Sequence, residues 1–526
     1  MTFLGIFNQK TEFSSIHVII SLSILAVIGM TIRLFYFQYE IPLTFDALLY
    51  FWYANDLSIS HKFPEIVATN NGWPIFLSLF FSIYDSNNFL DYMNMQRIIA
   101  MSLSVITIIP IYLICKKFAA EKFALVGGAI FILEPRIIQN SIFGITEPLY
   151  LLLFSISLVL FLSSNKKMIY ISSAIIGICS IVRAEGLLIF LVFSIVYFIK
   201  FRKEGKRIIP KYVLCITIII LIILPMMIIR TETIGADGLI TRYLNSIEQF
   251  TTNYNEENHI IYDKSQSLIK GFETLIKFLG WSSIPIFIIF VPIGIFSLLK
   301  TRKIENILIS TSFVIMIIPA LYAYSVPALD VRYLFILYPL FGVCSVLSLE
   351  YIYNKFKIKN DLFLIITVIG IIILSISFLE FKMVDVEHNI EAFELAEHVA
   401  NIVGNGTIFH YGQEEGFLEV VGFSKLNSFP ILNEEYDRKA PEVIRITGLD
   451  FQNLQEYIEF GRERGLTHLV LDGKLEPEPV MDAFYNIEKY PYLIKKFDSK
   501  EFDYSYHLQI YQIDYEKFDE IKNKSN

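Results

Sequence analysis

The sequence predicts a polytopic α-helical membrane protein with about eleven transmembrane helices and a C-terminal extracytoplasmic α/β domain. Of the 526 residues, 54% are hydrophobic and only 18% are charged, whereas a soluble globular protein carries about 25% charged residues. The shortage of charge is uneven along the chain. Residues 1–383 contain long apolar runs between short charged clusters, whereas residues 384–526 have the composition of an ordinary soluble domain. We therefore place a domain boundary near Met383.

The length of each apolar run decides the predicted spans, because a helix needs about 20 apolar residues to cross a bilayer. The first run is too long for the apolar core of a signal peptide. Several runs contain a proline, which a membrane helix tolerates when neighbouring groups satisfy the released carbonyl. The predicted spans are 15–38, 98–115, 123–142, 145–163, 168–183, 186–200, 209–229, 281–299, 304–323, 331–352 and 361–380.

Lysine and arginine set the predicted orientation, because they concentrate in the cytoplasmic loops of membrane proteins. Basic residues cluster in every second connection, starting after the second span. This alternation predicts a cytoplasmic N-terminus and an extracytoplasmic C-terminal domain. The basic connections are Lys116–Lys122, Lys166–Lys167, Lys200–Lys211, Lys300–Lys303 and Lys355–Lys359.

Two of the predicted external loops are long, residues 39–97 and 230–280. The first contains Phe45–Leu57, which could form an amphipathic helix, and Trp73–Tyr84, which is apolar but too short to span. We expect both segments to lie in the membrane interface, with aromatic side chains at headgroup depth. Long loops within compact proteins are commonly functional.

The C-terminal domain alternates helical and strand patterns, which favours an α/β fold. Its expected elements are a helix at Asn389–Val403, a strand at Thr407–Tyr411, a helix at Leu454–Arg464 that stops at Gly465, a strand at Thr467–Leu471, and a hairpin of Leu493–Phe502 with Tyr506–Tyr515.

Several functional classes lack support in the sequence. The net charge of −8 and the absence of a basic stripe interleaved with aromatic residues argue against nucleic-acid binding. No paired Cys/His spacing predicts a zinc site. The four cysteines lie in or beside apolar segments, so the C-terminal domain has no disulfides.

Charged residues at the outer ends of the predicted helices are the candidate functional residues, because charge at membrane depth is costly. They come from many different spans, so we expect the helix ends to converge around one site. The set is Asp46, Glu134, Arg136, Glu147, Arg183, Glu185, Arg230, Asp330 and Arg332. Arg33 and Arg97, near the outer ends of the first two spans, could instead be ordinary snorkelling side chains.

Each candidate also has a structural alternative. Asp46 could be a general base, and it could cap a helix that begins at Ala47; the two roles can coexist. Glu134 and Glu147, each before a proline, could complement a helix dipole or orient an acceptor or sugar. The pairs Arg183–Glu185 and Asp330–Arg332 could be local ion pairs, or their arginines could bind phosphate through the planar guanidinium fork.

The ordered set of motifs resembles the GT-C class of membrane glycosyltransferases, and within it the protein O-mannosyltransferase and aminoarabinose-transferase group. The resemblance covers about residues 15–380. It departs at Ala47, where many relatives carry a second acidic residue after the first-loop aspartate. The matching motifs are Asp46 in Thr44–Tyr50, Gly72–Leu77, Arg97 with Pro110 and Tyr112, Glu134–Pro135, Thr146–Leu149, Val182–Gly186, and Arg332–Leu334 through Tyr338–Leu340.

This resemblance implies a glycosyltransferase that moves a hexosyl group from a polyprenyl-phosphate donor to an extracytoplasmic protein hydroxyl, lipid or glycan by inverting displacement. Asp46 would take the proton from the acceptor hydroxyl. The donor phosphate would need cationic stabilisation, for which the candidates are Arg183, Arg230 and Arg332. Acceptor or sugar positioning would fall to Glu147, Glu134 and Tyr50. The scheme requires no metal ion and no other cofactor.

Three other functions remain open at the level of sequence. A transporter or flippase of lipid-linked or small substrates would be expected to show inverted repeats and mid-membrane charges, whereas here the charges sit at helix ends. An oligosaccharyltransferase would be expected to carry a Trp-Trp-Asp-type motif in its C-terminal domain, but no tryptophan follows Trp281. The third alternative is a non-catalytic scaffold or sensor.

Overall fold

The computed structural model describes most of the chain and divides it into two compact units. The described residues are 15–43, 45–65, 71–86, 88–241, 244, 254–255, 260–261, 264–326, 329–358, 360–403, 407–411, 443–445, 453–472 and 478–525. Part of the second predicted external loop, 230–280, lies outside these ranges. The membrane unit holds the described residues within Met1–Phe37, Leu49–Tyr84 and Met95–Phe381, and the C-terminal unit holds those within Gln38–Leu48, Asp85–Asn94 and Lys382–Asn526.

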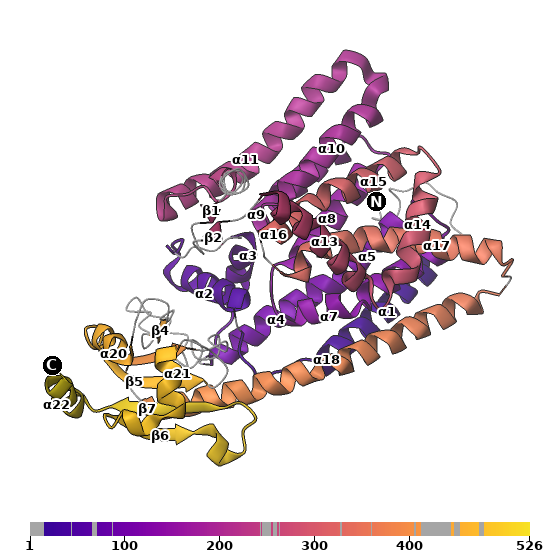
Figure 1. The fold of residues 1–526 in the computed structure, drawn as a ribbon. Coiled ribbons are helices and arrows are strands. Elements are labelled where there is room, and N and C mark those ends of the chain that lie inside the picture. Colours follow the sequence, from indigo (N-terminus) through magenta and orange to yellow (C-terminus); the bar gives the residue numbers. More distant parts are fainter. Residues whose placement is uncertain are drawn as a thin grey trace. The chain divides into compact units, whose positions relative to one another are not determined.

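The membrane unit consists of helices (Figure 1). They are α1 (Ser15–Phe35), α2 (Phe45–Ser60, its first turn in the C-terminal unit), α3 (Gly72–Phe81), α4 (Phe89–Ile106, up to Asn94 in the C-terminal unit), α5 (Ile108–Cys115), α6 (Glu121–Ile132), α7 (Pro135–Ile142), α8 (Glu147–Phe161), α9 (Met168–Val182), α10 (Gly186–Phe201), η2 (Arg202–Arg207), α11 (Ile208–Ile234), α13 (Lys264–Ser283), α14 (Phe287–Leu299), α15 (Ile304–Met316), α16 (Ile318–Ser325), η3 (Val331–Leu337), α17 (Tyr338–Lys355) and α18 (Leu362–Val403, from Lys382 in the C-terminal unit). Two short strands, β1 (Tyr254–Asn255) and β2 (Ile260–Ile261), pair antiparallel.

A helix occupies each of the eleven predicted spans. By length and composition, six of the described helical stretches could cross a membrane, or up to eight if each of two bent pairs counts as one span. The shorter apolar helices α3, α8 and α9 have 10–17 residues. These lengths establish an integral membrane architecture, and the number of crossings stays a prediction.

The helices differ in how much of their apolar surface the protein covers. The continuous stretch Gly186–Ile234 is only 17% buried over its most apolar window, whereas Val331–Lys355 is 78% buried. Side chains such as Leu221 and Ile228 on α11 are exposed, as expected for a surface that faces lipid. In contrast, α17 packs against α5, α6 and α14 and lies at the centre of the bundle.

Two pairs of helices are sharply bent. The axis turns by 48° between α6 and α7, and by 109° between α13 and α14. At the first bend, Pro135 occupies the beginning of α7, where its missing N–H removes no helical hydrogen bond. The residue before a proline avoids helical geometry, and Glu134 accordingly has extended backbone angles. The bend therefore places the Glu134 carboxylate inside the bundle.

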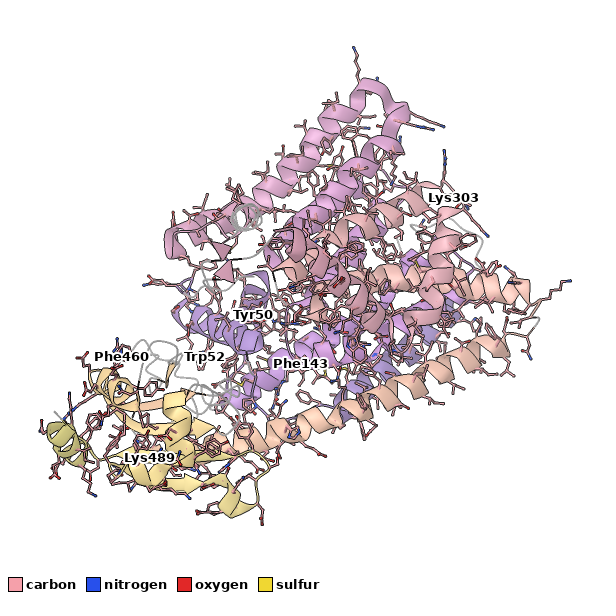
Figure 2. The ribbon with its side chains drawn as sticks, viewed as in Figure 1. Tyr50, Trp52, Phe143, Lys303, Phe460 and Lys489 are labelled. Atoms are coloured by element: carbon pink, nitrogen blue, oxygen red, sulfur yellow. The ribbon has the colours of Figure 1, made fainter. Side chains whose placement is uncertain are left out.

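The helices predicted in the first external loop are present as α2 and α3, but their surroundings differ from the expectation. Tyr50, Phe51, Trp52, Tyr53 and Ala54 are all buried, and five consecutive helical positions cover every side of a helix. Figure 2 labels Tyr50 and Trp52 on α2. The aromatic run is thus enclosed by protein, which the sequence did not show, because an apolar pattern does not distinguish burial by lipid from burial by protein; its headgroup depth stays a prediction.

On α3, the buried Trp73 indole donates a hydrogen bond to the carbonyl oxygen of Gly144 at 3.0 Å. Gly72 lies against the end of α9: a Cβ on this residue would be 2.7 Å from the Val182 nitrogen. These two contacts hold α3 against the α7–α8 turn and the end of α9, directly beside Thr146 and Arg183.

The C-terminal unit is built on a five-stranded mixed sheet in the order β4–β3–β5–β7–β6. The strands are β3 (Thr407–Tyr411), β4 (Val443–Arg445), β5 (Leu466–Asp472), β6 (Leu493–Asp498) and β7 (Leu508–Ile513), and β3 runs parallel to β4 and β5. The antiparallel β6–β7 pair is the predicted hairpin, with η5 (Ser499–Phe502) between its strands. The remaining elements are α20 (Leu454–Arg462), α21 (Glu478–Tyr485), η4 (Ile487–Lys489) and α22 (Tyr515–Ser525).

Helices cover both faces of this sheet. Successive strand residues point to opposite faces, and Leu469 and Val470 in β5 accordingly join different hydrophobic clusters. Leu469 packs with residues of α20, α21 and α22, whereas Val470 packs with Leu395 and Val399 near the end of α18. The helix predicted at Asn389–Val403 is the last part of the 42-residue α18 and not a separate element.

Candidate functional site

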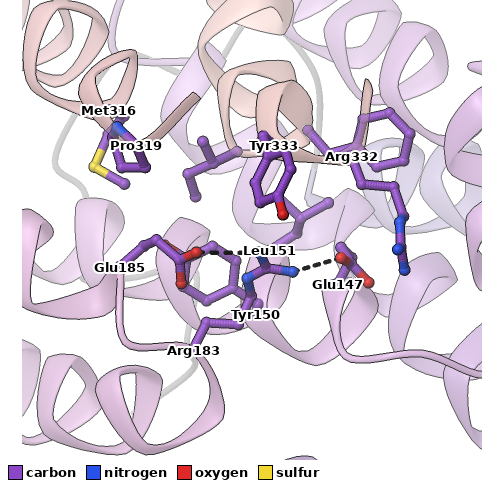
Figure 3. A pocket seen from close by; sticks show the side chains of 11 residues that line it. Glu147, Tyr150, Leu151, Arg183, Glu185, Met316, Pro319, Arg332 and Tyr333 are labelled. Atoms are coloured by element: carbon purple, nitrogen blue, oxygen red, sulfur yellow. Dashed lines mark hydrogen bonds and ion pairs between the residues drawn. The ribbon is translucent and has the colours of Figure 1, made fainter. Parts of the chain in front are cut away.

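A pocket with charged walls lies at the N-terminal end of α8 in the membrane unit (Figure 3). Three segments distant in sequence form it: the first turns of α8, the α9–α10 turn, and the region from α15 through η3. Its lining residues are Glu147, Tyr150, Leu151, Arg183, Glu185, Met316, Pro319, Arg332, Tyr333, Phe335 and Ile336. Four of the candidate functional residues, Glu147, Arg183, Glu185 and Arg332, therefore line one pocket.

The Arg183 guanidinium lies between two carboxylates, as Figure 3 shows. Its Nη1 is 2.5 Å from Glu147 Oε1, and its Nη2 is 3.2 Å from Glu185 Oε1. The three side chains are only 4–16% exposed, so solvent screens these pairs weakly. At an effective dielectric of 20, unit charges 4 Å apart interact by about 4 kcal/mol. Arg183 also lies over the Tyr150 ring, at 5.7 Å from its centroid.

Local geometry explains how these side chains meet. Glu147, Tyr150 and Leu151 are separated by three and four positions on α8, so they share one helix face. The α9–α10 turn closes with a 2.9 Å hydrogen bond from the Gly186 nitrogen to the Arg183 carbonyl. A Cβ on Gly186 would lie 2.6 Å from the Ser180 nitrogen, so this close turn requires glycine.

Arg332 and Tyr333, both on η3, also line the pocket. Asp330 caps η3 by accepting a 2.8 Å hydrogen bond from the Arg332 nitrogen, and its Oδ2 is 2.5 Å from Arg332 Nε. The Tyr324 hydroxyl donates to the Asp330 carbonyl at 2.9 Å. The Arg332 side chain is 35% exposed, clearly more than that of Arg183. The predicted local pair of Asp330 and Arg332 is thus present, and its arginine borders the pocket.

Glu134 and Arg136 lie at the α6–α7 bend and do not line the pocket. Glu134 is fully buried, 3.6 Å from Arg136 Nη1, and its carboxylate accepts no hydrogen bond from the described residues. Arg136 donates to the Ile284 carbonyl and lies over the Trp281 and Phe378 rings at 5.0 and 4.6 Å. This pair therefore connects α7 to the α13–α14 bend and to α18.

Arg230 belongs to a second buried network beside the α9–α10 turn. Its Nη1 donates to Asn71 Oδ1, and Asn71 Nδ2 donates to the Tyr53 hydroxyl at 2.8 Å. All three side chains are buried. Asn71 precedes Gly72, and Gly72 lies against Val182, the residue before Arg183. Arg230 itself does not line the pocket.

The remaining predicted residues, Asp46 and Tyr50, are on α2. Asp46 is exposed in the first turn of this helix and groups with the C-terminal unit, whereas the buried Tyr50 groups with the membrane unit. Neither residue is among those that line the pocket. Asp46 lies within the helix that begins at Phe45, so it is not the residue before a helix starting at Ala47.

Some site residues were not predicted from the sequence. Tyr150 lies one turn after Glu147 and Tyr333 follows Arg332, so proximity to a candidate charge was the available signal. Arg33, for which the sequence allowed a snorkelling role, is fully buried. Among the described residues, no group of three or more His, Cys, Asp or Glu side chains is arranged to hold a metal ion.

Comparison with known proteins identifies the fold. No protein-family model and no curated protein sequence matches the chain. Among solved structures, the oligosaccharyltransferase AglB of Archaeoglobus fulgidus, tethered to an acceptor peptide, matches with a TM-score of 0.57 and 12% identity over 88% of this chain and 69% of that chain. The aminoarabinose transferase ArnT of Cupriavidus metallidurans, bound to undecaprenyl phosphate, matches with a TM-score of 0.54 and 10% identity over 95% of this chain and 98% of that chain. At such identities the likeness establishes the fold alone, and the chain has the fold of the GT-C class of membrane glycosyltransferases.

Proposed function

We propose that this protein transfers a hexosyl group from a polyprenyl-phosphate donor to an extracytoplasmic acceptor. The observation that carries the proposal is the pocket in which Glu147, Arg183 and Arg332 meet within a GT-C fold. Solved proteins of the same fold hold the relevant ligands: ArnT was solved with undecaprenyl phosphate, and AglB with dolichol-phosphate and an inhibitory peptide. The acceptor is a protein hydroxyl, a lipid or a glycan.

The proposed reaction is a single displacement. Asp46, an exposed carboxylate in the first turn of α2, takes the proton from the acceptor hydroxyl while that oxygen attacks the anomeric carbon. The bond between the anomeric carbon and the phosphate oxygen breaks, and the lipid phosphate leaves as an anion. A leaving anion needs fixed positive charge and no proton.

Arg332 is the proposed phosphate ligand, because its guanidinium borders the pocket and is partly exposed. Arg230 adds positive charge from the network that contains Asn71. Glu147 contacts the sugar or the acceptor from the pocket wall. Glu134 and Tyr50 are buried, and we assign them to holding the α6–α7 bend and α2 in place.

We further propose that the chain crosses the membrane eleven times, with a cytoplasmic N-terminus and an extracytoplasmic C-terminal domain from about residue 384. Two observations support this topology. A helix is present in each predicted span, and lysine and arginine cluster in alternate connections. The charged pocket would then open on the side where the acceptor resides.

The test is transfer of a radiolabelled sugar from a polyprenyl-phosphate donor by the full-length protein in liposomes. We expect Asp46→Asn to lower release of label by about 100-fold or more, the range that a general base contributes. Glu305→Gln is the matched control, since Glu305 also lies in the first turn of a helix, α15, at the predicted cytoplasmic side. Equal release by wild type and Asp46→Asn would remove Asp46 from the role of base.

The enzyme class itself has a separate test. If folded wild-type protein releases no sugar from a panel of such donors, the transferase proposal fails. Movement of the intact labelled donor across the bilayer without release would then favour a flippase.

A further inference from the structure

The Glu147–Arg183–Glu185 cluster has more carboxylates than cations. One guanidinium is bonded through Nη1 to Glu147 and through Nη2 to Glu185, so the three groups carry a formal charge of −1. They form one wall of the pocket and lie close to the Tyr150 ring. The sequence predicted Arg183 as a phosphate ligand, and this geometry favours a different role.

A phosphate that approached Arg183 would meet one cation and two anions. Two of the five N–H donors of the guanidinium already donate to carboxylates, so a phosphate on the other donors would lie beside both carboxylates. Like charges that are nearly buried repel strongly. Arg332 differs, because it pairs through Nε with the single carboxylate of Asp330 and its side chain is more exposed.

A hydroxyl group suits the same wall better than a phosphate does. An ionised carboxylate only accepts hydrogen bonds, and its two oxygens together offer about four lone-pair sites. Glu147 uses Oε1 for Arg183 and accepts a 3.4 Å contact from Thr146 on Oε2, which leaves acceptor capacity on each oxygen. Tyr150 and Tyr333 add aromatic surface and a hydroxyl on neighbouring walls.

We infer that Arg183 is a positioning residue that holds Glu147 and Glu185 side by side as hydrogen-bond acceptors for the hydroxyl groups of a sugar. This inference rests on the proposed transferase activity and assigns the pocket wall to the sugar, leaving the phosphate to Arg332. Glu185 thereby becomes a residue that determines sugar specificity. The hydroxyls belong either to the donor sugar or to a sugar acceptor.

The experiment compares two ligands on the full-length protein in liposomes: polyprenyl phosphate without sugar, used as an inhibitor, and the complete sugar donor. We expect Glu185→Gln to raise KM for a sugar substrate roughly tenfold to a hundredfold, because a hydrogen bond to a charged group is lost. The inhibition constant of polyprenyl phosphate should stay within about twofold of wild type. Arg332→Gln is the matched control and should instead raise the inhibition constant of polyprenyl phosphate.

The kinetic constants distinguish the two possible sources of the hydroxyls. A rise in KM for the donor assigns the subsite to the donor sugar, and a rise in KM for the acceptor assigns it to the acceptor. A donor or acceptor that lacks the contacting hydroxyl should be insensitive to Glu185→Gln. A purely structural role for Glu185 would not produce this selectivity.

Arg183→Gln provides a second test of the inference. If this variant does not fold, the result for Glu185→Gln alone decides. The inference is overturned if Glu185→Gln leaves both KM values unchanged. It is also overturned if Arg183→Gln raises the inhibition constant of polyprenyl phosphate as much as Arg332→Gln does. Both results require an active wild type. Failure of the proposed function would appear earlier, as wild-type protein that releases no sugar.

Discussion

Arg33 Nη1 donates a hydrogen bond to the carbonyl oxygen of Ile132 at 3.1 Å, at the residue where α6 ends. The same guanidinium donates to the Gly29 carbonyl at 2.9 Å, to Ser141 Oγ at 3.0 Å and to Ser104 Oγ at 2.8 Å. One fully buried side chain thus joins α1, α4, α6 and α7 around the bend that carries Glu134. Its charge is therefore tolerated because its donors have partners in the protein.

We expect Arg33→Met to lower the free energy of unfolding by about 2–5 kcal/mol, because several buried acceptors lose a charged donor. The measurement is equilibrium unfolding of the full-length protein in mixed detergent micelles. Arg302→Met is the matched control, since Arg302 is exposed. Similar unfolding of the two variants would show that Arg33 does not hold the bend.

Gly186→Ala should destabilise the protein by about 1–3 kcal/mol, because its Cβ would meet the backbone of Ser180. The turn that carries Arg183 and Glu185 would shift, so the sugar-transfer rate should fall as well. Gly370→Ala is the opposite case. Apart from its chain neighbours and the local helix backbone, no atom lies within 4 Å of a Cβ built on Gly370 in α18, so that change should be neutral or stabilise by up to about 1 kcal/mol. Thermal unfolding of both variants checks the pair, and a neutral Gly186→Ala would contradict the close-turn argument.

Asn71→Ala should raise KM for the lipid-phosphate donor roughly fivefold to a hundredfold, because Arg230 loses the side chain that orients it. The value of kcat should change less than KM, since the proposed role of Arg230 is binding. Asn165→Ala serves as control, because Asn165 is an exposed asparagine in the α8–α9 connection. An unchanged KM in Asn71→Ala would show that the Asn71–Arg230 contact does not contribute to donor binding.

The C-terminal unit should lose a stabilising interaction in acid. The Tyr490 hydroxyl, Lys489 and Asn486 donate to Asp482 and lower its pKa to about 2. A carboxyl group with a depressed pKa stabilises the folded state above its ordinary pKa near 3.8, and this contribution disappears as pH falls towards 2. The difference in melting temperature between wild type and Asp482→Asn should therefore shrink between pH 5 and pH 2. A difference that does not depend on pH would show that the Asp482 charge is not responsible.

The helices of the membrane unit were predictable because their signal is local. A long apolar run has few alternatives to a helix in a membrane, and a helix is found in every run identified. The strands β3 and β5 were predicted because each is a short segment that follows a helix and a glycine, and β6 and β7 were predicted together as a hairpin. The bends were harder to predict. Pro135 marks the position of the first bend, but the 48° angle between the helices depends on what α6 and α7 pack against.

The candidate site was predictable only in part. Glu147, Arg183 and Arg332 were chosen as charges at helix ends, and they do line one pocket. Arg230 and Glu134 were chosen in the same way, yet they lie in separate buried networks. Position along a helix gives depth in the membrane, but it does not determine which neighbours a side chain meets.

By itself, the sequence determined the apolar helices, the change in composition near residue 383 and the charged residues concentrated at helix ends. These features follow from interactions within one segment, or between one segment and the membrane. The tertiary structure decided that Arg183 pairs with Glu147, 36 positions away, that Arg33 reaches Ile132, and that the aromatic residues of α2 are enclosed by protein. Such pairings depend on how helices distant in sequence pack together, and that packing is set by the whole bundle and not by any single segment.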